Sequence, residues 1–145
     1  MELRRYQDGD FARLYAIEEV CFQPPLRFGR GMMRQLVDSA VAATWIAEED
    51  GVMMGFAIVE WTVDPGLVTA YIPTIEVLPV QRRSGVGAEL LRRLEMSAAD
   101  AGAGLIWLHV DVENDRQSAF IARQDISAAG GRNIITAAIG QLKCI

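Results

Sequence analysis

The chain has 145 residues, of which 51% are hydrophobic and 23% are charged, so we expect one domain over residues 1–145 with a substantial core. Its net charge of -5 argues against nucleic acid as a partner, because phosphate backbones are bound by basic surfaces. It has no apolar run of about 18 residues and no apolar secretory core near its start, which predicts a soluble, cytoplasmic protein without a membrane partner.

A strand and two helices are predicted first. Residues 3–6 predict a short strand, after which Asp8 or Asp10 can cap a helix. The apolar residues of this helix recur at helical spacing and are Phe11, Leu14, Ile17 and Val20. A Pro-Pro pair ends the helix, and a second helical run over residues 32–37 follows a glycine-containing segment.

The middle of the chain is rich in β-forming residues. Residues 44–47 and 52–61 predict two strands, and the polar turn between them at residues 48–51 indicates a hairpin. A second turn, which contains Pro65, precedes a further strand over residues 68–78.

A helix over residues 85–101, ended by a Gly-Ala-Gly sequence, and a strand over residues 105–112 follow. The predicted order of strand, two helices, three-strand meander, helix and strand is typical of a three-layer α+β or α/β domain.

A metal centre or a disulfide is not expected. Cys21 and Cys144 are far apart and lack metal-ligand spacing, so we interpret them as reduced thiols. A single histidine excludes most histidine-based metal sites.

The most informative stretch is Arg82-Arg83-Ser84-Gly85-Val86-Gly87, which lies between a predicted strand and a predicted helix. A glycine-spaced turn that opens a helix directs several backbone N–H groups to one point, where the helix dipole adds positive charge. The two glycines leave room for a diphosphate, and the two arginines can contact its oxygens. We therefore predict a phosphate-binding loop.

Two common phosphate loops do not fit this stretch. A P-loop requires Lys-Ser/Thr after its last glycine, where this chain has Ala88-Glu89. The dinucleotide fingerprint requires a third glycine, where this chain has Leu90. The remaining pattern is Arg/Gln-x-x-Gly-x-Gly at the start of a helix.

Residues 74–91, TIEVLPVQRRSGVGAELL, resemble the acetyl-coenzyme A loop of the GNAT acetyltransferase superfamily in the order of strand, proline, loop and helix. The resemblance implies a mixed, mostly antiparallel sheet flanked by helices, with splayed fourth and fifth strands and the pantetheine arm between them. It implies acetyl-coenzyme A as cosubstrate. The coenzyme contacts that it carries over are Ile75, Val77, Arg82, Arg83, Ser84, Gly85, Val86, Gly87, Ala88 and Asn114.

Two candidates can accept the proton of the acceptor amine. Glu76 lies on the predicted fourth strand and His109 on the fifth. In the ribosomal-protein-alanine N-acetyltransferases, which the chain resembles most among GNAT enzymes, a glutamate lies five residues before a motif asparagine, and His109 has this position relative to Asn114. A lone histidine on an apolar strand is also commonly a core residue.

The resemblance implies an N-acetyltransferase that acts on a primary amine, with a protein N-terminus as the first choice of acceptor. A catalytically impaired acyl-coenzyme A binding protein and a small-molecule amine acetyltransferase remain alternatives. The acceptor pocket of the family is built by loops whose sequence encodes no readable preference.

The resemblance stops after Asn114, and Ile121 stands where the family tyrosine would protonate the leaving thiolate. In a shifted reading frame, each codon consists of the last base of one codon and the first two bases of the next. In this frame residues 119–121 can encode Leu-Tyr or Leu-His, and Leu-Tyr is the family sequence at this place. We hypothesise that residues 115–145 are the out-of-frame product of a small insertion or deletion, and the coding DNA tests this.

The unusual tail affects how the sheet can end. Residues 118–129 are predicted as a helix and residues 133–139 as a β-prone segment. A tail that was not selected to close the sheet leaves a strand edge open, and an open edge favours a homodimer or strand exchange.

Overall fold

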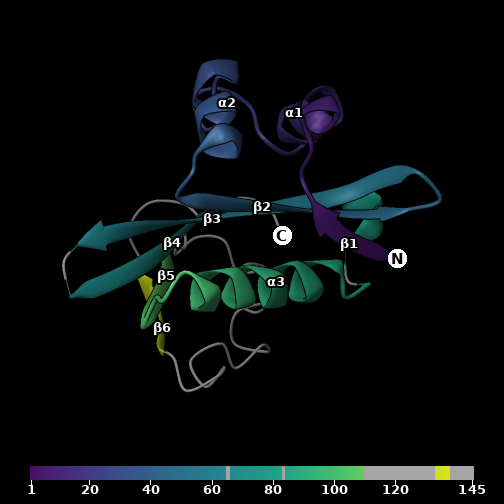
Figure 1. The fold of residues 1–145 in the computed structure, drawn as a ribbon. Helices are drawn as coiled ribbons and strands as arrows, with labels where there is room; N and C mark the ends of the chain where they lie inside the picture. The colour runs from purple at the N-terminus through teal and green to yellow at the C-terminus, as the bar shows by residue number, and fades with distance from the viewer. Residues whose placement is uncertain (65, 83, 110–132, 138–145) are drawn as a thin grey trace.

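The computed structural model describes residues 1–64, 66–82, 84–109 and 133–137 (Figure 1). In chain order the elements are β1 (Glu2–Arg5), η1 (Asp8–Asp10), α1 (Phe11–Cys21), α2 (Arg30–Asp38), β2 (Ala42–Glu49), β3 (Val52–Asp64), β4 (Leu67–Val77), η2 (Pro79–Gln81), α3 (Val86–Asp100), β5 (Leu105–His109) and β6 (Asn133–Ala137). None of the described helices is long and apolar enough to cross a membrane.

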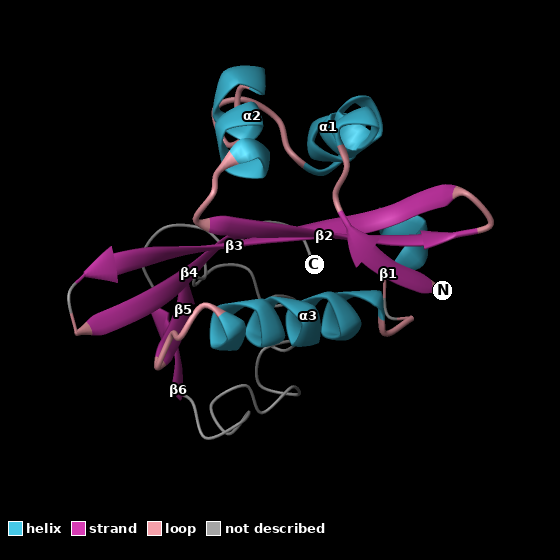
Figure 2. Ribbon diagram, viewed as in Figure 1, coloured by secondary structure: helices cyan, strands magenta, loops and turns pink. Residues whose placement is uncertain are grey.

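One sheet organises the domain, with the described strands in the order β1-β2-β3-β4-β5-β6. The pairs from β1 to β4 are antiparallel, whereas β4-β5 and β5-β6 are parallel. α1 and α2 lie on one face of the sheet and α3 lies on the other (Figures 1 and 2). This arrangement confirms the predicted three-layer α+β fold.

Each face of the sheet carries its own hydrophobic core. The core under α3 includes Ile75, Val77, Leu90, Leu94 and Ile106, each at most 1% exposed. The core under α1 and α2 is built around Leu14, Met33, Ile46, Phe56 and Ile58. Val20 is 57% exposed, so its predicted place in the core is wrong. At 3.6 residues per turn Val20 lies on the side of α1 opposite Phe11 and Glu18, which are buried.

The predicted hairpin is confirmed and is longer than the sequence pattern indicated. At its turn Asp50 and Gly51 both have positive φ, at 52° and 79°, as a tight turn between twisted strands requires. β3 extends to Asp64 because pairing with β4 continues past the apolar run, as far as Asp64 with Leu67. Residues 110–112 of the predicted fifth strand lie outside the described residues.

A bulge interrupts the pairing of β3 with β4. Ile58 pairs with Thr74 and Glu60 pairs with Tyr71, so two β4 residues, Ile72 and Pro73, face a single β3 residue. Proline has no N–H to donate to the ladder and is tolerated at such a position. Because of the extra residue, both Ile72 and Ile75 belong to the core under α3.

β4 and β5 separate after a short paired segment. They pair only from Thr69 with Leu105 to Tyr71 with Trp107, although β4 continues to Val77 and β5 to His109. The predicted splay of the fourth and fifth strands is therefore confirmed. We call the opening between the two diverging strands the wedge.

The tail contributes one strand to the described structure. β6 pairs in parallel with the whole of β5, from Leu105 with Asn133 to His109 with Ala137. The predicted pairing of residues 133–139 is thus confirmed for Asn133–Ala137. β6 is the last of the described strands, so an open strand edge stays a prediction. The predicted helix at residues 118–129 lies outside the described residues, and the homodimer stays a prediction.

Candidate functional site

The loop that the sequence singled out lies at the N-terminus of α3. η2 ends at Gln81, and Gly85 is the N-cap of α3 with φ 89° and ψ 0°. A Cβ added at Gly85 would meet no atom within 4 Å, so positive φ, rather than lack of space, favours glycine there. Ser84 is exposed and donates its hydroxyl to the backbone oxygen of Gln81, while Val86 and Gly87 are buried. The loop therefore presents the first amides of a 15-residue helix.

Arg82 connects this loop to the end of β4. Its Nε donates to the backbone oxygen of Val77 at 3.0 Å, and its Nη2 lies 3.6 Å from the Sγ of Cys21 at the end of α1. The side chain is thus directed to the end of β4, whereas the sequence suggested that it would close on phosphate oxygens. Arg83 lies outside the described residues.

The end of β4 offers backbone groups to the wedge. The N–H of Leu78 donates to the oxygen of Met54 on β3 at 2.9 Å. Because N–H groups alternate along a strand, those of Ile75 and Val77 point away from β3, toward the side on which β5 has diverged. By the same alternation the Val77 oxygen points away from β3, where it accepts the hydrogen bond from Arg82.

Close packing of β3 against β4 holds this edge in place. Gly55 pairs with Val77, and a Cβ on Gly55 would lie 2.5 Å from the backbone oxygen of Glu76. The lack of a side chain at Gly55 therefore sets the position of residues 76 and 77.

The two predicted catalytic residues lie on adjacent strands. Glu76 is fully buried, and its Oε2 accepts a hydrogen bond from the Thr74 hydroxyl at 2.5 Å. His109 is the last residue of β5 and pairs with Ala137, but its side chain is not described. Both follow the point where β4 and β5 separate, so the wedge divides them. Two further predicted coenzyme contacts are Asn114 and Ala88. Asn114 lies outside the described residues, and Ala88 lies in the first turn of α3.

Arginines further along α3 do not extend the loop. Arg92 forms an ion pair with Glu89, and the Arg93 guanidinium lies 5.0 Å from the centre of the Trp45 ring. Trp45 also donates its indole N–H to Ser97 at 2.9 Å. The two contacts of Trp45 attach α3 to β2, so they support the helix that carries the loop, whereas the Arg92 ion pair lies within α3.

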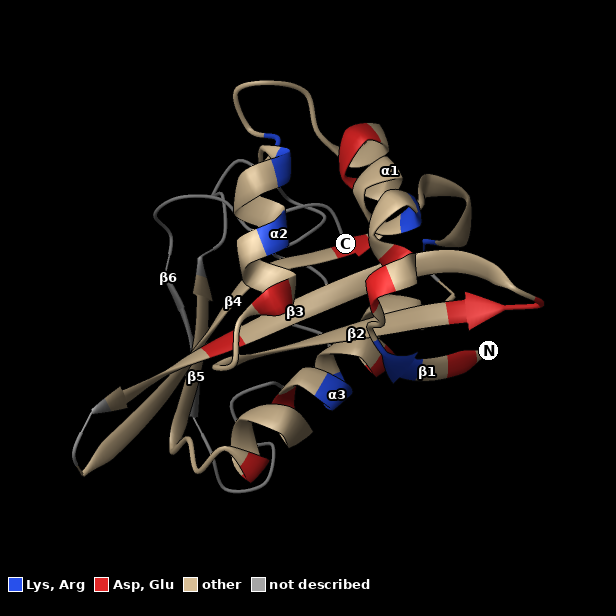
Figure 3. Cartoon of the chain, turned by 45° about the horizontal axis from the view of Figure 1, so that its top comes forward, with Lys and Arg blue, Asp and Glu red and all other residues tan. Residues whose placement is uncertain are grey.

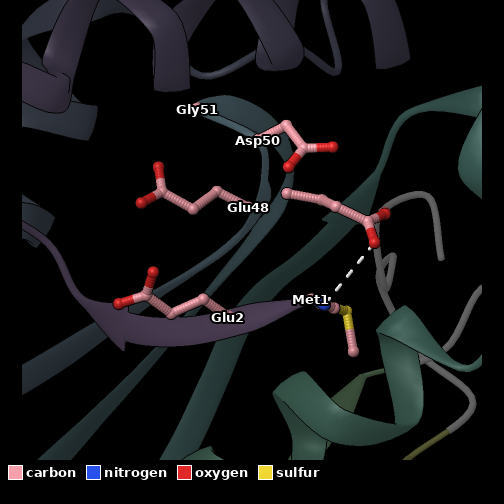
Figure 4. Close-up of a pocket in the computed structure, with 6 residues that line it drawn as sticks. Met1, Glu2, Glu48, Asp50 and Gly51 are labelled. Atoms are coloured by element: carbon pink, nitrogen blue, oxygen red, sulfur yellow. Dashed lines mark ion pairs between the residues drawn. The ribbon is translucent and has the colours of Figure 1, made fainter.

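A pocket at the β2-β3 hairpin is lined by Met1, Glu2, Glu48, Glu49, Asp50 and Gly51 (Figure 4). The Met1 ammonium lies 3.6 Å from Glu49, and acidic segments mark this end of the sheet (Figure 3). Carboxylates at this density repel a diphosphate. The described residues also contain no cluster of three or more side chains suited to hold a metal ion.

Residues 11–125 match the family model described as "Acetyltransferase (GNAT) family". The chain belongs to this family. The match continues past Asn114, where the sequence resemblance was expected to stop. A search of curated protein sequences finds no match.

Solved structures of GNAT enzymes share the fold. The ribosomal-protein-S18-alanine N-acetyltransferase of Escherichia coli has a TM-score of 0.73 and 21% identity over 86% of this chain and 76% of its own. The aminoglycoside 6'-N-acetyltransferase AAC(6')-IG of Acinetobacter haemolyticus has a TM-score of 0.72 and 17% identity over 86% and 90%. AAC(6')-Iy, solved with the bisubstrate analog CoA-S-monomethyl-acetylneamine, has a TM-score of 0.74 and 17% identity over 86% and 88%.

Sequence reasoning missed two features of this GNAT domain. One is the bulge at Ile72 and Pro73, which a proline inside a strand pattern signals. The other is a row of side chains across β3, β4 and β5, namely Glu60, Tyr71 and Trp107, whose register positions match. The sequence feature that could have indicated the row is Glu60, a charged residue inside the otherwise apolar run of β3.

Proposed function

We propose that this GNAT protein is an acetyl-coenzyme A-dependent N-acetyltransferase that moves an acetyl group to a primary amine. The observation that carries the proposal is the alignment of three parts. The loop before α3 has amides for the diphosphate, Arg82 attaches this loop to Val77, and the backbone of residues 75–77 borders the wedge. An extended thioester arm fits this path from the loop along β4.

In the reaction, the amine nitrogen forms a bond to the thioester carbonyl carbon, and the carbon–sulfur bond breaks. The nitrogen loses one proton, the sulfur leaves as thiolate and takes up one proton, and the products are an acetamide and free coenzyme A. The Val77 N–H is the residue group suited to polarise the thioester carbonyl, because it points toward the wedge.

Glu76 and His109 are the candidates for accepting the amine proton. Glu76 is buried beside the Thr74 hydroxyl, so this hydroxyl or a water in the wedge would relay the proton to it. Ile121 has no proton to give to the thiolate. We therefore expect slow turnover unless solvent protonates the sulfur, which keeps an impaired acyl-coenzyme A binding protein as the alternative.

A protein N-terminus is the first candidate acceptor, since the resemblance of residues 74–91 and of the strand ending at Asn114 is nearest to ribosomal-protein-alanine N-acetyltransferases. A small amine is the second, because the aminoglycoside acetyltransferases share the fold at similar TM-scores.

Two glycines at opposite ends of α3 provide a matched test of coenzyme binding. Gly85 and Gly102 both have φ 89° and open space around an added Cβ, so substitution strains the backbone equally. Gly85→Asp also puts a carboxylate where the diphosphate would bind, and we expect it to abolish binding of acetyl-coenzyme A in calorimetry. Gly102→Asp should leave the affinity within about twofold of wild type. Equal affinity in the two variants would show that the loop assignment is wrong.

Catalysis is tested separately by thiol release with a panel of N-terminal peptides and small amines. Release with one class of acceptor and with no other decides the substrate. Binding of acetyl-coenzyme A without release from any acceptor supports the impaired binding protein instead.

A further inference from the structure

Three side chains form a row across the strands at the closed end of the wedge. Glu60 on β3 pairs with Tyr71 on β4, and Tyr71 pairs with Trp107 on β5. The Tyr71 and Trp107 rings have their centres 4.4 Å apart. Tyr71 and Trp107 are also the last pair before β4 and β5 separate. The row therefore marks the base of the wedge.

All three side chains lie on the face of the sheet opposite α3. Each alternates with residues of the α3 core: Ala70 and Ile72 flank Tyr71, Ile106 and Leu108 flank Trp107, and Val59 and Trp61 flank Glu60. Successive side chains of a strand point to opposite faces. The row thus shares its face with α1 and α2, outside the two hydrophobic cores.

The Glu60 carboxylate is partly buried. No arginine or lysine among the described residues forms an ion pair or hydrogen bond with Glu60. Burial raises the pKa of Glu60. The pKa of Tyr71 is also raised, mainly by burial and to a smaller extent by the negative charge of Glu60. A partly desolvated carboxylate beside the Tyr71 ring, which in turn lies against the Trp107 ring, is well suited to a cation, which gains from the charge and from the ring faces.

The position of the row relates it to the acceptor. If the diphosphate binds at Gly85 and the thioester arm follows β4 from Val77, the arm runs toward Tyr71, and its acyl end approaches the base of the wedge. A group bound at the row then lies near the acetyl group, on the α1 and α2 face. This step rests on the function proposed above.

We propose that Glu60, Tyr71 and Trp107 form a subsite for a second positively charged group of the acceptor, distinct from the amine that is acetylated. This group is an ammonium of a small polyamine or a basic side chain near a peptide N-terminus. Glu60 supplies the opposite charge, and the two rings cover the apolar part of the cation.

The test compares pairs of acceptors that differ by one positive charge. The pairs are 1,4-diaminobutane with n-butylamine, and a peptide beginning Ala-Arg with one beginning Ala-Gln. Calorimetry with the full chain, with and without acetyl-coenzyme A, measures binding, and thiol release measures turnover. The variants are Glu60→Gln and, as a control, Glu2→Gln, which removes the same charge from an exposed position on β1, at the other side of the sheet.

We expect wild type and Glu2→Gln to bind the charged member of at least one pair about tenfold or more tightly than its neutral partner. The pair that shows this preference identifies the source of the cation. Glu60→Gln should reduce the ratio to near one while the neutral member binds as before. Trp107→Leu should weaken the preference without abolishing it.

Two failures are distinguishable. If acetyl-coenzyme A binds but Glu60→Gln keeps the preference, or wild type shows none, the subsite is wrong and the proposed function stands. If acetyl-coenzyme A does not bind, the proposed function is wrong. Binding of 1,4-diaminobutane or the Ala-Arg peptide that depends on Glu60 then still supports the cation site, and its absence overturns the site as well.

Discussion

Gly55 provides a sensitive test of how the structure positions the coenzyme edge. An alanine Cβ at this position would lie 2.5 Å from the Glu76 oxygen and 3.2 Å from the Val77 Cα. Ordinary contacts begin at 3.4 Å, so the oxygen must move by the difference between 3.4 and 2.5, about 0.9 Å. Both obstacles are backbone atoms in the centre of the sheet, which cannot rotate aside.

We expect Gly55→Ala to lower the free energy of unfolding by roughly 1–3 kcal/mol, the usual cost of overpacking a core. The lower backbone entropy of alanine in the unfolded chain offsets part of this, by about 0.5–1 kcal/mol. A displaced β4 also moves the N–H groups of Ile75 and Val77. We therefore expect weaker binding of acetyl-coenzyme A as well as lower stability.

Urea unfolding and calorimetry measure the two effects. Gly104→Ala is the control, because Gly104 has open space around its Cβ position and no positive φ. The control keeps this entropic gain without the clash, so it should be as stable as wild type or up to about 1 kcal/mol more stable. The reasoning is refuted if Gly55→Ala unfolds and binds acetyl-coenzyme A like the control, since β3 and β4 would then not approach each other as described.

The remaining predictions concern stability. Asp10 is 4% exposed and accepts hydrogen bonds from both Arg4 Nη atoms at 2.8 Å and from Arg13 at 2.8 Å. Asp10→Asn should therefore lower the free energy of unfolding, measured with urea, by about 1.5–3 kcal/mol. Asp8→Asn, at an exposed position, is the control. The Arg4 guanidinium lowers the pKa of Asp10 and of Glu48 by hydrogen bonding. A carboxyl whose pKa is lowered by folding stabilises the protein above its unfolded pKa of about 4, and this stabilisation is lost as the pH falls. In Arg4→Met the free energy of unfolding should therefore decrease less than in wild type as the pH falls below about 5. An unchanged pH profile would contradict the assignment. The Trp45 indole N–H donates to Ser97 at 2.9 Å, so Trp45→Phe and Ser97→Ala should each lower the free energy of unfolding by about 1 kcal/mol. The double variant should lose less than the sum of the two, and strict additivity would exclude a shared hydrogen bond.

Local patterns in the sequence were enough for the elements and for the family. Helical spacing located α1, the Glu-Glu-Asp-Gly turn located the hairpin, and the glycine-spaced loop before α3 predicted the fold that the domain has. Such features depend on residues within a few positions of each other, because capping, turn geometry and helix dipoles act over one or two turns of chain.

The geometry of the wedge was decided by tertiary structure. The turning of Arg82 toward Val77, the close approach of Gly55 to β4, and the row from Glu60 to Trp107 all join residues from different strands or loops. The row depends on the bulge at Ile72 and Pro73, because without its extra residue Glu60 would pair with Ile72 in place of Tyr71. Register and strand divergence result from packing summed over the whole sheet, so no short segment of the sequence contains them.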